Sequence, residues 1–484
     1  MTPSRFRALQ LLLFYGTLFT LPLSVNWVSE HWGAGLLLVS EPLMAVGAGT
    51  LVLGTLNGWI AWPRALNPLD KLIGLHFAAL LLATVFSSDP LVSAKFLATL
   101  LLYASFGYVL PRVLELERGE WLAAVGALAL GTGVLVGYVL VRQFLLGISY
   151  QLSYSIAEPF LHHGHTNLTV MLEPLVLMLN LALLHKTRTQ GFRVRVLTSV
   201  LLTAVLMVVA FSYSRASYAS LLVQALLLLG YAGWGVGRRL LLPWAVCGLL
   251  ILAAWQVLEK VHPQASRPSD PQLLHELSSV GDFSPANESN AERKSRWLFS
   301  LALFQQRPVA GVGPGTFADR YLDFVRSSPS HPTYYTTLRR MNAHNLYIGW
   351  LVEAGALGLA TGLALLGHVG WRLLRRGWRW PAPLGQVGFT VFFLSFALHS
   401  LTQDFWQEPR VVVLFWLGLG LLRHYERNHP SAAARPAPLA RAKLWVPPVA
   451  PAATQSPARR GPRYPERSLP ARPEGVPPPN RRKT

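Results

Sequence analysis

Long apolar runs recur along almost the whole chain, and they restrict its fold more than any other feature. Three of them are LQLLLFYGTLFTLPLSV, WLAAVGALALGTGVLVGYVLV and VLTSVLLTAVLMVVAFSYS. Each approaches or reaches the roughly 20 residues that a helix needs to cross a bilayer. Charged residues make up only 14% of the chain, against about 25% in an ordinary soluble domain, because charge in the bilayer core is costly. The sequence therefore predicts an all-α polytopic membrane protein.

The first apolar run has two interpretations. Arg5 and Arg7 precede it, as basic residues precede the apolar part of a signal peptide. However, no small-residue cleavage site follows cleanly, and further apolar spans come at once. We therefore expect a retained first helix rather than a removed leader.

We expect twelve spans in total. They lie near residues 8–26, 33–55, 70–86, 91–111, 121–146, 166–184, 195–213, 216–235, 240–258, 344–368, 386–403 and 410–425. The basic segments HKTRTQGFRVR, GRR and WRLLRRGWRW fall on one side of these spans, whereas SVNWVSEHW, FSSDPLVSAK and SLTQDFWQEPR fall on the other. Because cytoplasmic loops collect Lys and Arg, the N-terminus is expected in the cytoplasm. This topology also accounts for the formal net charge of +20 without a nucleic-acid partner.

Two hydrophilic segments divide the chain into four parts. Spans one to nine occupy residues 1–258, a large loop occupies 259–343, and spans ten to twelve occupy 344–426. The loop follows the ninth span, so it is expected on the outer face, with an amphipathic helix and aromatic residues that let it pack. Residues 427–484 are rich in Pro, Ala and Arg and are expected to form a disordered, basic cytoplasmic tail.

Outward stretches carry the unusual cations. Arg215 lies at the apex of a turn in SYSRASYASLL, and Arg293, Lys294 and Arg296 begin the amphipathic helix of the loop. A guanidinium grips a phosphate with paired N–H groups, so these cations suit an anionic ligand. The alternatives are an Arg that snorkels at the membrane surface and a solvated helix end. Arg293 lies four residues before Trp297, on the same helix face.

His344 stands where the loop re-enters the membrane, within RRMNAHNLYIGWLVEAGALG. A His at a helix N-terminus favours its neutral form, because the positive end of the helix dipole disfavours the added proton. A neutral imidazole can accept a proton from a hydroxyl, as a general base does. The alternative is a capping or interfacial His. Glu353 lies deeper in the same helix and needs a partner, for which an arginine or His399 is a candidate.

Three further features are interpreted as structural. GVGPGTF lacks the Lys-Ser/Thr of a nucleotide-binding P-loop and is read as a turn that returns the chain to the membrane. His162, His163 and His165 have no Cys or carboxylate at ligand spacing, so no metal is expected there, and sugar contacts or interfacial packing are favoured. Cys247 lies mid-helix, and a single thiol forms no internal disulfide.

Taken in order, several segments resemble the bacterial O-antigen ligase and O-antigen polymerase superfamily. HNLYIGWLVEAGALG resembles its His-Asn-x9-Gly-x2-Gly signature, and ERKSRWLFSLALFQQRPVAGVGPGTF is similar to the Arg-x-x-x-Trp run of its large periplasmic loop. SYSRASYASLL and FSSDPLVSAKFL are similar to two further segments. Twelve spans with one large outward loop before the tenth match the family's layout. The resemblance covers roughly residues 70–425 and leaves out the basic tail.

The resemblance implies an inverting glycosyl transfer, without metal or other cofactor, at the periplasmic face of the bacterial inner membrane. The donor is a glycan on undecaprenyl diphosphate, the acceptor of a ligase is lipid A–core, and membrane lipids are further partners. Carried over residue by residue, His344 is the base, and Arg215 with Arg293 or Arg296 binds diphosphate. The spacing to Trp297 favours Arg293. The other candidate substrate contacts are Asn345, His162, His165, Asp404 and Arg339.

Other activities compete with ligation. The polymerase and protein O-glycosylating branches share these motifs, so the acceptor is left open, with the ligase preferred. A transporter or flippase of lipid-linked sugars is a hypothesis of another class. It predicts charged residues lining the interior on both sides and a repeated half. The polar candidates instead crowd one outer face, which favours the enzyme.

Overall fold

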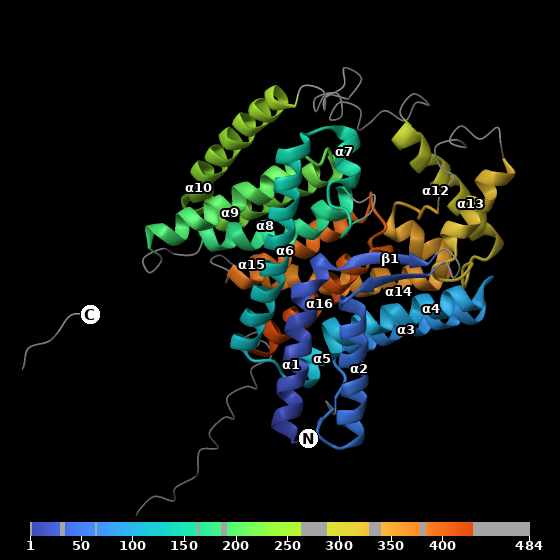
Figure 1. Ribbon diagram of the computed structural model, residues 1–484. Helices are drawn as coiled ribbons and strands as arrows, with labels where there is room; N and C mark the ends of the chain where they lie inside the picture. Colours follow the sequence, from blue (N-terminus) through green and yellow to red (C-terminus); the bar gives the residue numbers. More distant parts are fainter. Residues whose placement is uncertain are drawn as a thin grey trace, which may run out of the picture. The chain divides into compact units, whose positions relative to one another are not determined.

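The computed structural model describes residues 2–29, 34–62, 65–161, 165–184, 191–262, 288–328, 340–377 and 384–428, which belong to the unit Met1–Ser431. The architecture is helical (Figure 1). The helices are α1 (Pro3–Thr20), α2 (Ser40–Leu56), α3 (Pro68–Val85), α4 (Pro90–Ala104), α5 (Leu110–Val113), α6 (Arg118–Leu146), α7 (Tyr150–Ser155), α8 (His165–Leu184), α9 (Phe192–Ala210), α10 (Arg215–Val261), α12 (Glu288–Gln306), α13 (Phe317–Ser327), α14 (Leu346–Gly377), α15 (Leu384–His399) and α16 (Pro409–Asn428). Short 3₁₀ or π turns lie at Leu21–Leu23, Ser105–Val109 and Phe405–Gln407.

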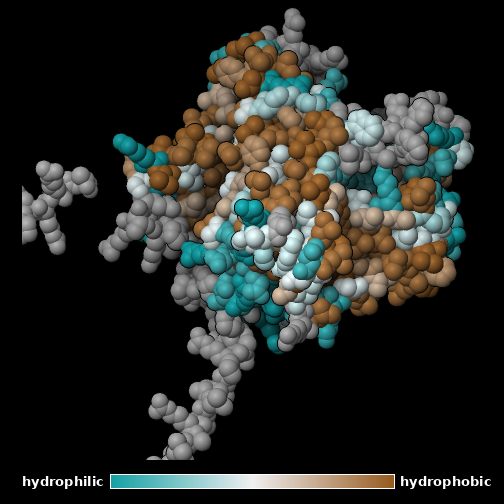
Figure 2. Space-filling model, turned by 60° about the horizontal axis from the view of Figure 1, so that its bottom comes forward, coloured by the Kyte–Doolittle hydropathy of each residue, from teal (hydrophilic) through white to brown (hydrophobic). Residues whose placement is uncertain are grey.

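Within the described ranges, eight helices are long and apolar enough to cross a membrane. They are Pro3–Leu23, Pro68–Val85, Pro90–Val113, Arg118–Leu146, Thr166–Leu184, Phe192–Ala210, Gly237–Val261 and Leu346–Arg375. Shorter apolar helices lie at Ser40–Leu56, Arg215–Gly230 and Val387–His399. Figure 2 shows apolar residues over much of the helical surface in view. The helix composition is that of a multi-pass membrane protein, while the total of twelve spans stays a prediction.

A β-hairpin replaces helix where the first two spans were expected to meet. Strand β1 (Val25–Ser29) pairs antiparallel with β2 (Ala34–Leu38), so the expected ends at residues 26 and 33 are wrong. Buried polar groups hold this segment: the Leu37 N–H donates to a Glu41 carboxylate oxygen at 3.0 Å, and Arg410 donates to the Ser24 carbonyl at 2.6 Å. These contacts satisfy backbone groups that a helix would otherwise pair.

Helix α10 covers two expected spans in one element. A Cβ built on Gly237 would lie 3.6 Å from the Leu229 Cα, whereas residues eight apart in a straight helix are about 12 Å apart. The element therefore folds back between these residues. Its second part exposes Leu242, Leu249 and Leu252 by 72%, 67% and 62%, as expected of a helix that faces lipid.

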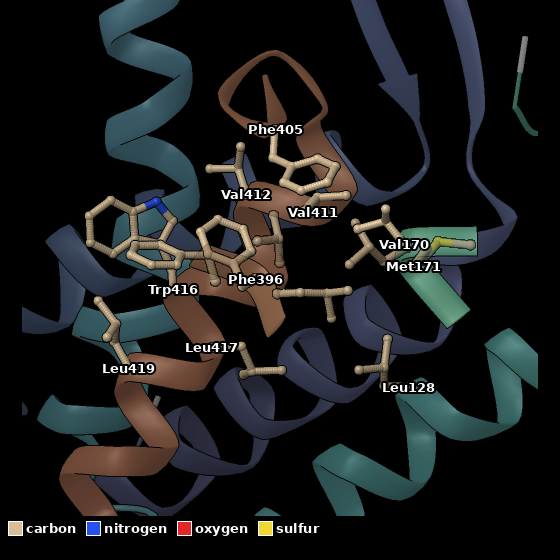
Figure 3. Close-up of a cluster of buried hydrophobic side chains, with 14 of the residues drawn as sticks. Leu128, Val170, Met171, Phe396, Phe405, Val411, Val412, Trp416, Leu417 and Leu419 are labelled. Carbon is tan, nitrogen blue, oxygen red and sulfur yellow. The ribbon is translucent and has the colours of Figure 1, made fainter. Parts of the chain in front are cut away.

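The centre of the helical unit forms around α16. Figure 3 shows Val411, Val412 and Trp416 of this helix against Phe396 and Val170. All five are at most 6% exposed. Burial of this kind on several sides makes α16 a central helix, although it ends in charged residues. The core places the turn between α15 and α16 beside the start of α14, where His344 lies.

Helix α14 is interrupted at Gly355, and the chain after α12 fills the break. Gly355 has φ 67° and ψ −167°, a conformation confined almost entirely to glycine. The Ala356 N–H donates to the Pro308 carbonyl at 2.8 Å, and the Gly313 N–H donates to the Glu353 carbonyl at 2.9 Å. GVGPGTF thus lies in the turn that joins α12 to α13 and docks onto the broken membrane helix.

We expect Gly355→Ala to destabilise the protein. A Cβ there would lie 2.2 Å from the Val309 carbonyl oxygen, and the strained backbone and the clash together cost roughly 2–4 kcal/mol. Gly367→Ala, on the same helix with no atom within 4 Å of its Cβ, should change stability by less than about 1 kcal/mol. Thermal unfolding in detergent measures both. Equal melting temperatures for the two variants would show that the break does not require glycine.

Candidate active site

The backbone before α14 holds His344 in an unusual conformation. His344 has φ 53°, in the left-handed region that favours small polar residues at turns. Its N–H donates to the Asn342 side-chain oxygen at 3.0 Å. The Asn345 side-chain oxygen accepts from the N–H groups of Tyr347 and Ile348, each at 3.0 Å, as a helix N-cap does. The imidazole is therefore presented by a tight turn immediately ahead of a capped helix.

Helix α12 covers this turn from the loop side. Trp297 Nε1 donates to the Ala343 carbonyl at 3.1 Å, and an Arg296 nitrogen lies 3.4 Å from the Asn342 carbonyl oxygen. Arg296 is 2% exposed and pairs with Glu292 at 2.6 Å, one helical turn before it. Trp297 and Arg296 thus lie against the carbonyls of Ala343 and Asn342, although the sequence spacing had paired Trp297 with Arg293.

The structure brings three distant arginines into one electrostatic neighbourhood. Burial, together with the nearby charges of Arg215 and Arg296, lowers the pKa of Arg293 to about 10, while Glu292 opposes the shift. Arg293 also donates to the Asn290 side-chain oxygen at 2.9 Å. Like charges held close together and partly shielded from water repel one another, so an anion bound among these guanidinium groups would be favoured.

His344 lies within reach of the same charges. Burial, followed by the charges of Arg296 and Arg293, lowers the pKa of His344 well below its usual value of 6.5. The Thr402 carbonyl and the Gln403 side chain oppose this shift. Among the residues that the structure describes, His344 Nδ1 has no hydrogen-bond partner. The arrangement is a neutral imidazole beside a cationic cluster, which can take a proton from a neutral hydroxyl.

Two carboxylates lie behind the start of α14. Glu353 accepts from the Phe317 N–H at 3.2 Å and from Gln407 Nε2 at 3.4 Å, so it ties the start of α13 to the 3₁₀ turn before α16. Asp404 is 6% exposed and accepts from the Trp406 N–H at 3.3 Å. Burial raises the pKa of Asp404 well above its usual value, with Glu353 adding to the shift.

The remaining predicted contacts are scattered or undescribed. Asn345, besides capping α14, donates to the Leu401 carbonyl at 2.9 Å, so its side chain is engaged on both ends. Arg340, which follows the predicted Arg339 in sequence and was not itself predicted, pairs with Asp319 of α13 at 2.5 Å on the surface. His165 begins α8, and its side chain is not described. His162, His163 and Arg339 lie outside the described residues.

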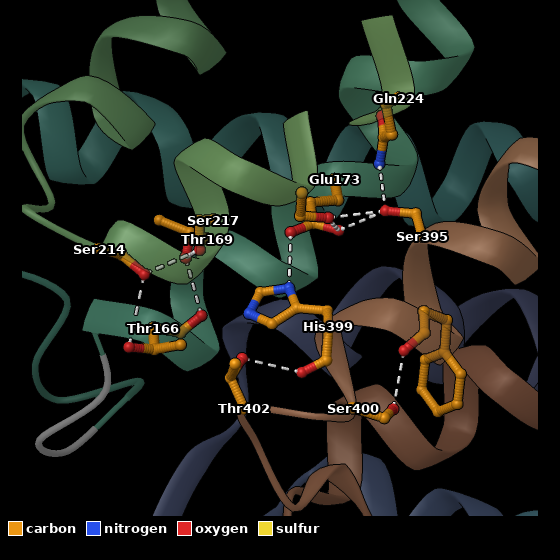
Figure 4. Close-up of polar contacts among 12 residues, drawn as sticks. Thr166, Thr169, Glu173, Ser214, Ser217, Gln224, Ser395, His399, Ser400 and Thr402 are labelled. Atoms are coloured by element: carbon orange, nitrogen blue, oxygen red, sulfur yellow. Dashed lines mark hydrogen bonds and ion pairs between the residues drawn. The ribbon is translucent and has the colours of Figure 1, made fainter. Parts of the chain in front are cut away.

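Sequence reasoning missed a polar cluster inside the helical unit, which Figure 4 shows around Glu173 of α8. Glu173 is 5% exposed and lies 3.0 Å from His399 Nδ1. His399 had been considered as a partner for Glu353, but it pairs with Glu173. The signal was available, since an acidic residue within an apolar span always needs a partner.

Tyrosines beside the arginines were also missed. The Tyr150 and Tyr154 hydroxyls lie 2.8 Å apart, and the ring of Tyr150 is 6.0 Å from that of Tyr213. Tyr213 has φ 56° and lies in the turn before α10, whose first residue is Arg215 and not the apex of the turn as expected. Tyr150 also acts on the pKa of Arg293. Rings with an apolar face and a polar hydroxyl suit a sugar.

Comparison with known proteins finds a family match for part of the chain. Residues 197–363 match the family described as O-antigen ligase (Wzy_C). The matched segment contains Arg215, Arg293, Arg296 and His344, while His399 and Asp404 lie beyond it. No curated protein sequence matches the chain.

Proposed function

We propose that the protein is a glycosyltransferase of the ligase type, because residues 197–363 match the O-antigen ligase family. Members of this family are generally enzymes that transfer lipid-linked glycans. In the proposed reaction, a glycan passes from undecaprenyl diphosphate to lipid A–core at the periplasmic face of the inner membrane. The observation that carries the proposal is a half-buried His344, kept neutral beside three arginines.

The arginine cluster would bind the donor diphosphate. Arg296 is already paired with Glu292 at 2.6 Å, whereas the described polar contact of Arg293 is to the neutral side chain of Asn290. Arg215 and Arg293 are therefore the proposed clamps, and Arg296 fixes the backbone beside His344. Guanidinium groups hold phosphate oxygens with paired N–H bonds.

The proposed chemistry is a single displacement. The acceptor hydroxyl oxygen attacks the anomeric carbon of the glycan while His344 takes the hydroxyl proton. The bond from that carbon to the diphosphate oxygen breaks, and its electron pair leaves with the diphosphate. Arg215 and Arg293 stabilise the charge that develops there. Attack opposite the leaving group inverts the configuration at the anomeric carbon.

Other residues would support this step. Tyr150, Tyr154 and Tyr213 lie beside the arginines and are proposed to contact the glycan. We assign Asn345 to holding the His344 turn, because both ends of its amide are engaged. Asp404 is proposed to support the start of α14 from behind, since a Cβ on Gly349 would lie 2.6 Å from its carboxylate.

Replacing Arg293 should change the pH dependence of the reaction. Activity requires neutral His344, so kcat/KM falls as the pH drops through the folded pKa of His344, which lies well below 6.5. Arg293→Gln removes a nearby positive charge, which raises that pKa. Initial transfer rates against pH should therefore show an acid limb at higher pH than in wild type. Lys294→Gln should leave the acid limb at its wild-type pH. Equal shifts of the two variants' profiles, or a shift of the Arg293→Gln limb to lower pH, would contradict the assignment.

The lipopolysaccharide made by a strain that lacks this protein distinguishes a ligase from a polymerase. Loss of all O-chain from lipid A–core would support the ligase. Core that carries a single repeat unit would identify a polymerase instead, and unaltered lipopolysaccharide would favour the protein O-glycosylating branch. If the protein were a flippase, its deletion would leave the lipid-linked donor accumulated on the cytoplasmic leaflet. Labelling of intact and opened membrane vesicles can detect this.

A further inference from the structure

Two layers of buried polar side chains, the upper and lower rungs of a ladder, lie between the Arg215 side and the His344 side of the candidate site. Their residues belong to α8, to α15 and to α10 or the residue just before it. The upper rung joins Thr169 of α8 to Ser217 and Ser214 of the Arg215 turn. The Ser214 and Ser217 hydroxyls lie 2.8 Å apart, and the Thr169 hydroxyl is hydrogen-bonded to Ser217. All three side chains are at most 2% exposed. The rung fixes the backbone from which Arg215 extends (Figure 4).

The lower rung lies one helical turn further along α8. Glu173 accepts from the Ser220 hydroxyl at 2.8 Å and lies 3.3 Å from the Ser395 hydroxyl. Its second oxygen faces His399 Nδ1 at 3.0 Å. Because a carboxylate only accepts hydrogen bonds, Nδ1 carries the proton. Gln224 completes the rung by donating to Ser395 at 3.3 Å.

The lower rung continues directly into the turn that holds His344. The Thr402 N–H and hydroxyl both lie 3.0 Å from the His399 carbonyl oxygen. The Leu346 N–H donates to the Ser400 carbonyl of the same turn at 3.0 Å. Thr402 also places its carbonyl beside the His344 imidazole. A carboxylate in α8 is thus connected through His399 to the groups that surround the base.

We propose that the Glu173–His399 pair is a positioning device that sets the His344 turn, while the Thr169–Ser217 rung sets the Arg215 turn. The proposal rests on the proposed function. A buried ionisable group in an apolar span is costly unless its partners are fixed. The pair therefore tolerates one arrangement of α8 against α15, and it holds the base in register with Arg215, the clamp residue at the start of α10.

Substitutions in the two rungs should affect different steady-state constants when an undecaprenyl-diphosphate glycan and lipid A–core are the substrates. Glu173→Ala leaves Ser220 and His399 without their partner, and we expect kcat to fall by about 10-fold or more, with the donor KM within about 2-fold of wild type. Glu173→Gln, whose amide can still bond the serines and the other His399 tautomer, should restore most of kcat. Ser217→Ala should instead raise the donor KM by about 5-fold or more and spare kcat.

A matched control lies further along α8. Asn180 is 4% exposed and accepts from Trp244 Nε1 at 2.8 Å, so Asn180→Leu removes a buried hydrogen bond of the same helix. It should lower the melting temperature while leaving kcat and KM unchanged. If Glu173→Ala does not accumulate, Ser395→Ala tests the same rung with one hydroxyl removed.

Two results would overturn the inference. One is a Glu173→Ala protein that melts at lower temperature but keeps wild-type kcat. The other is equal movement of kcat and KM by both rungs and by Asn180→Leu, which would mean general loss of structure. Binding of undecaprenyl diphosphate alone separates this from the proposed function. Wild-type protein that neither binds it nor transfers glycan would overturn the proposed function itself, and the ladder's role with it.

Discussion

His344→Ala is expected to abolish glycan transfer almost completely while leaving the protein folded. A general base contributes about 100- to 10,000-fold to a rate, and the half-buried imidazole beside Arg293 and Arg296 is held neutral for that task. The loss should appear in kcat, because the alanine removes the proton acceptor and no donor contact. Initial rates of transfer from an undecaprenyl-diphosphate glycan, measured with purified protein, provide the test.

A control for this variant lies near the other end of the same helix. His368→Ala removes an imidazole of α14 that is far along the chain from the turn of His344. It should retain wild-type kcat and donor KM. Binding of undecaprenyl diphosphate to His344→Ala should also persist, since the arginines are intact. A His344→Ala protein that transfers glycan at the wild-type rate would eliminate His344 as the base.

Arg293→Ala is expected to weaken donor binding by about 10- to 100-fold, the range for losing hydrogen bonds to a charged group. Arg293 is half-buried on α12, and the charges of Arg215 and Arg296 act on it. Lys294→Ala removes the same charge from the neighbouring, exposed position. It should change the donor KM by less than about 2-fold, because exposed charges are screened by water and salt.

The comparison of these two variants separates binding from general charge. Arg215→Ala should behave like Arg293→Ala, and calorimetric titration with undecaprenyl diphosphate should show both losses without any acceptor present. Equal effects of Arg293→Ala and Lys294→Ala would indicate a long-range field rather than a diphosphate clamp. Unaltered binding in Arg215→Ala would remove that residue from the clamp.

Much of the helical layout could be predicted because lipid leaves a strong signal in sequence. Apolar runs of bilayer length gave α6, α8 and α9 with nearly the observed bounds. The hairpin of β1 and β2 was missed, because one of the groups that hold it, Arg410, is far away in sequence and donates to the Ser24 carbonyl just before β1. The break at Gly355 was missed for the same reason, since its hydrogen bonds come from the chain that follows α12.

Single residues of the candidate site could be proposed from the sequence, but their arrangement in space could not. Arg215, Arg293 and His344 could be selected for their position on one expected face of the membrane. Their convergence depends on how α10, α12 and α14 pack, which periodicity does not encode. Glu173 could be recognised from sequence as a carboxylate that needs a partner. Its partner, His399, lies in a different helix and could be identified only from the three-dimensional structure.

Reconstitution with defined substrates tests the central claim most directly. Purified wild-type protein in liposomes receives an undecaprenyl-diphosphate glycan and lipid A–core, with His344→Ala and Arg293→Ala run in parallel. We predict that wild-type protein releases undecaprenyl diphosphate and forms a glycan bond to lipid A–core with inverted anomeric configuration, and that His344→Ala binds donor without transfer. Donor that stays intact with wild-type protein, or transfer at equal rate by His344→Ala, would contradict the account.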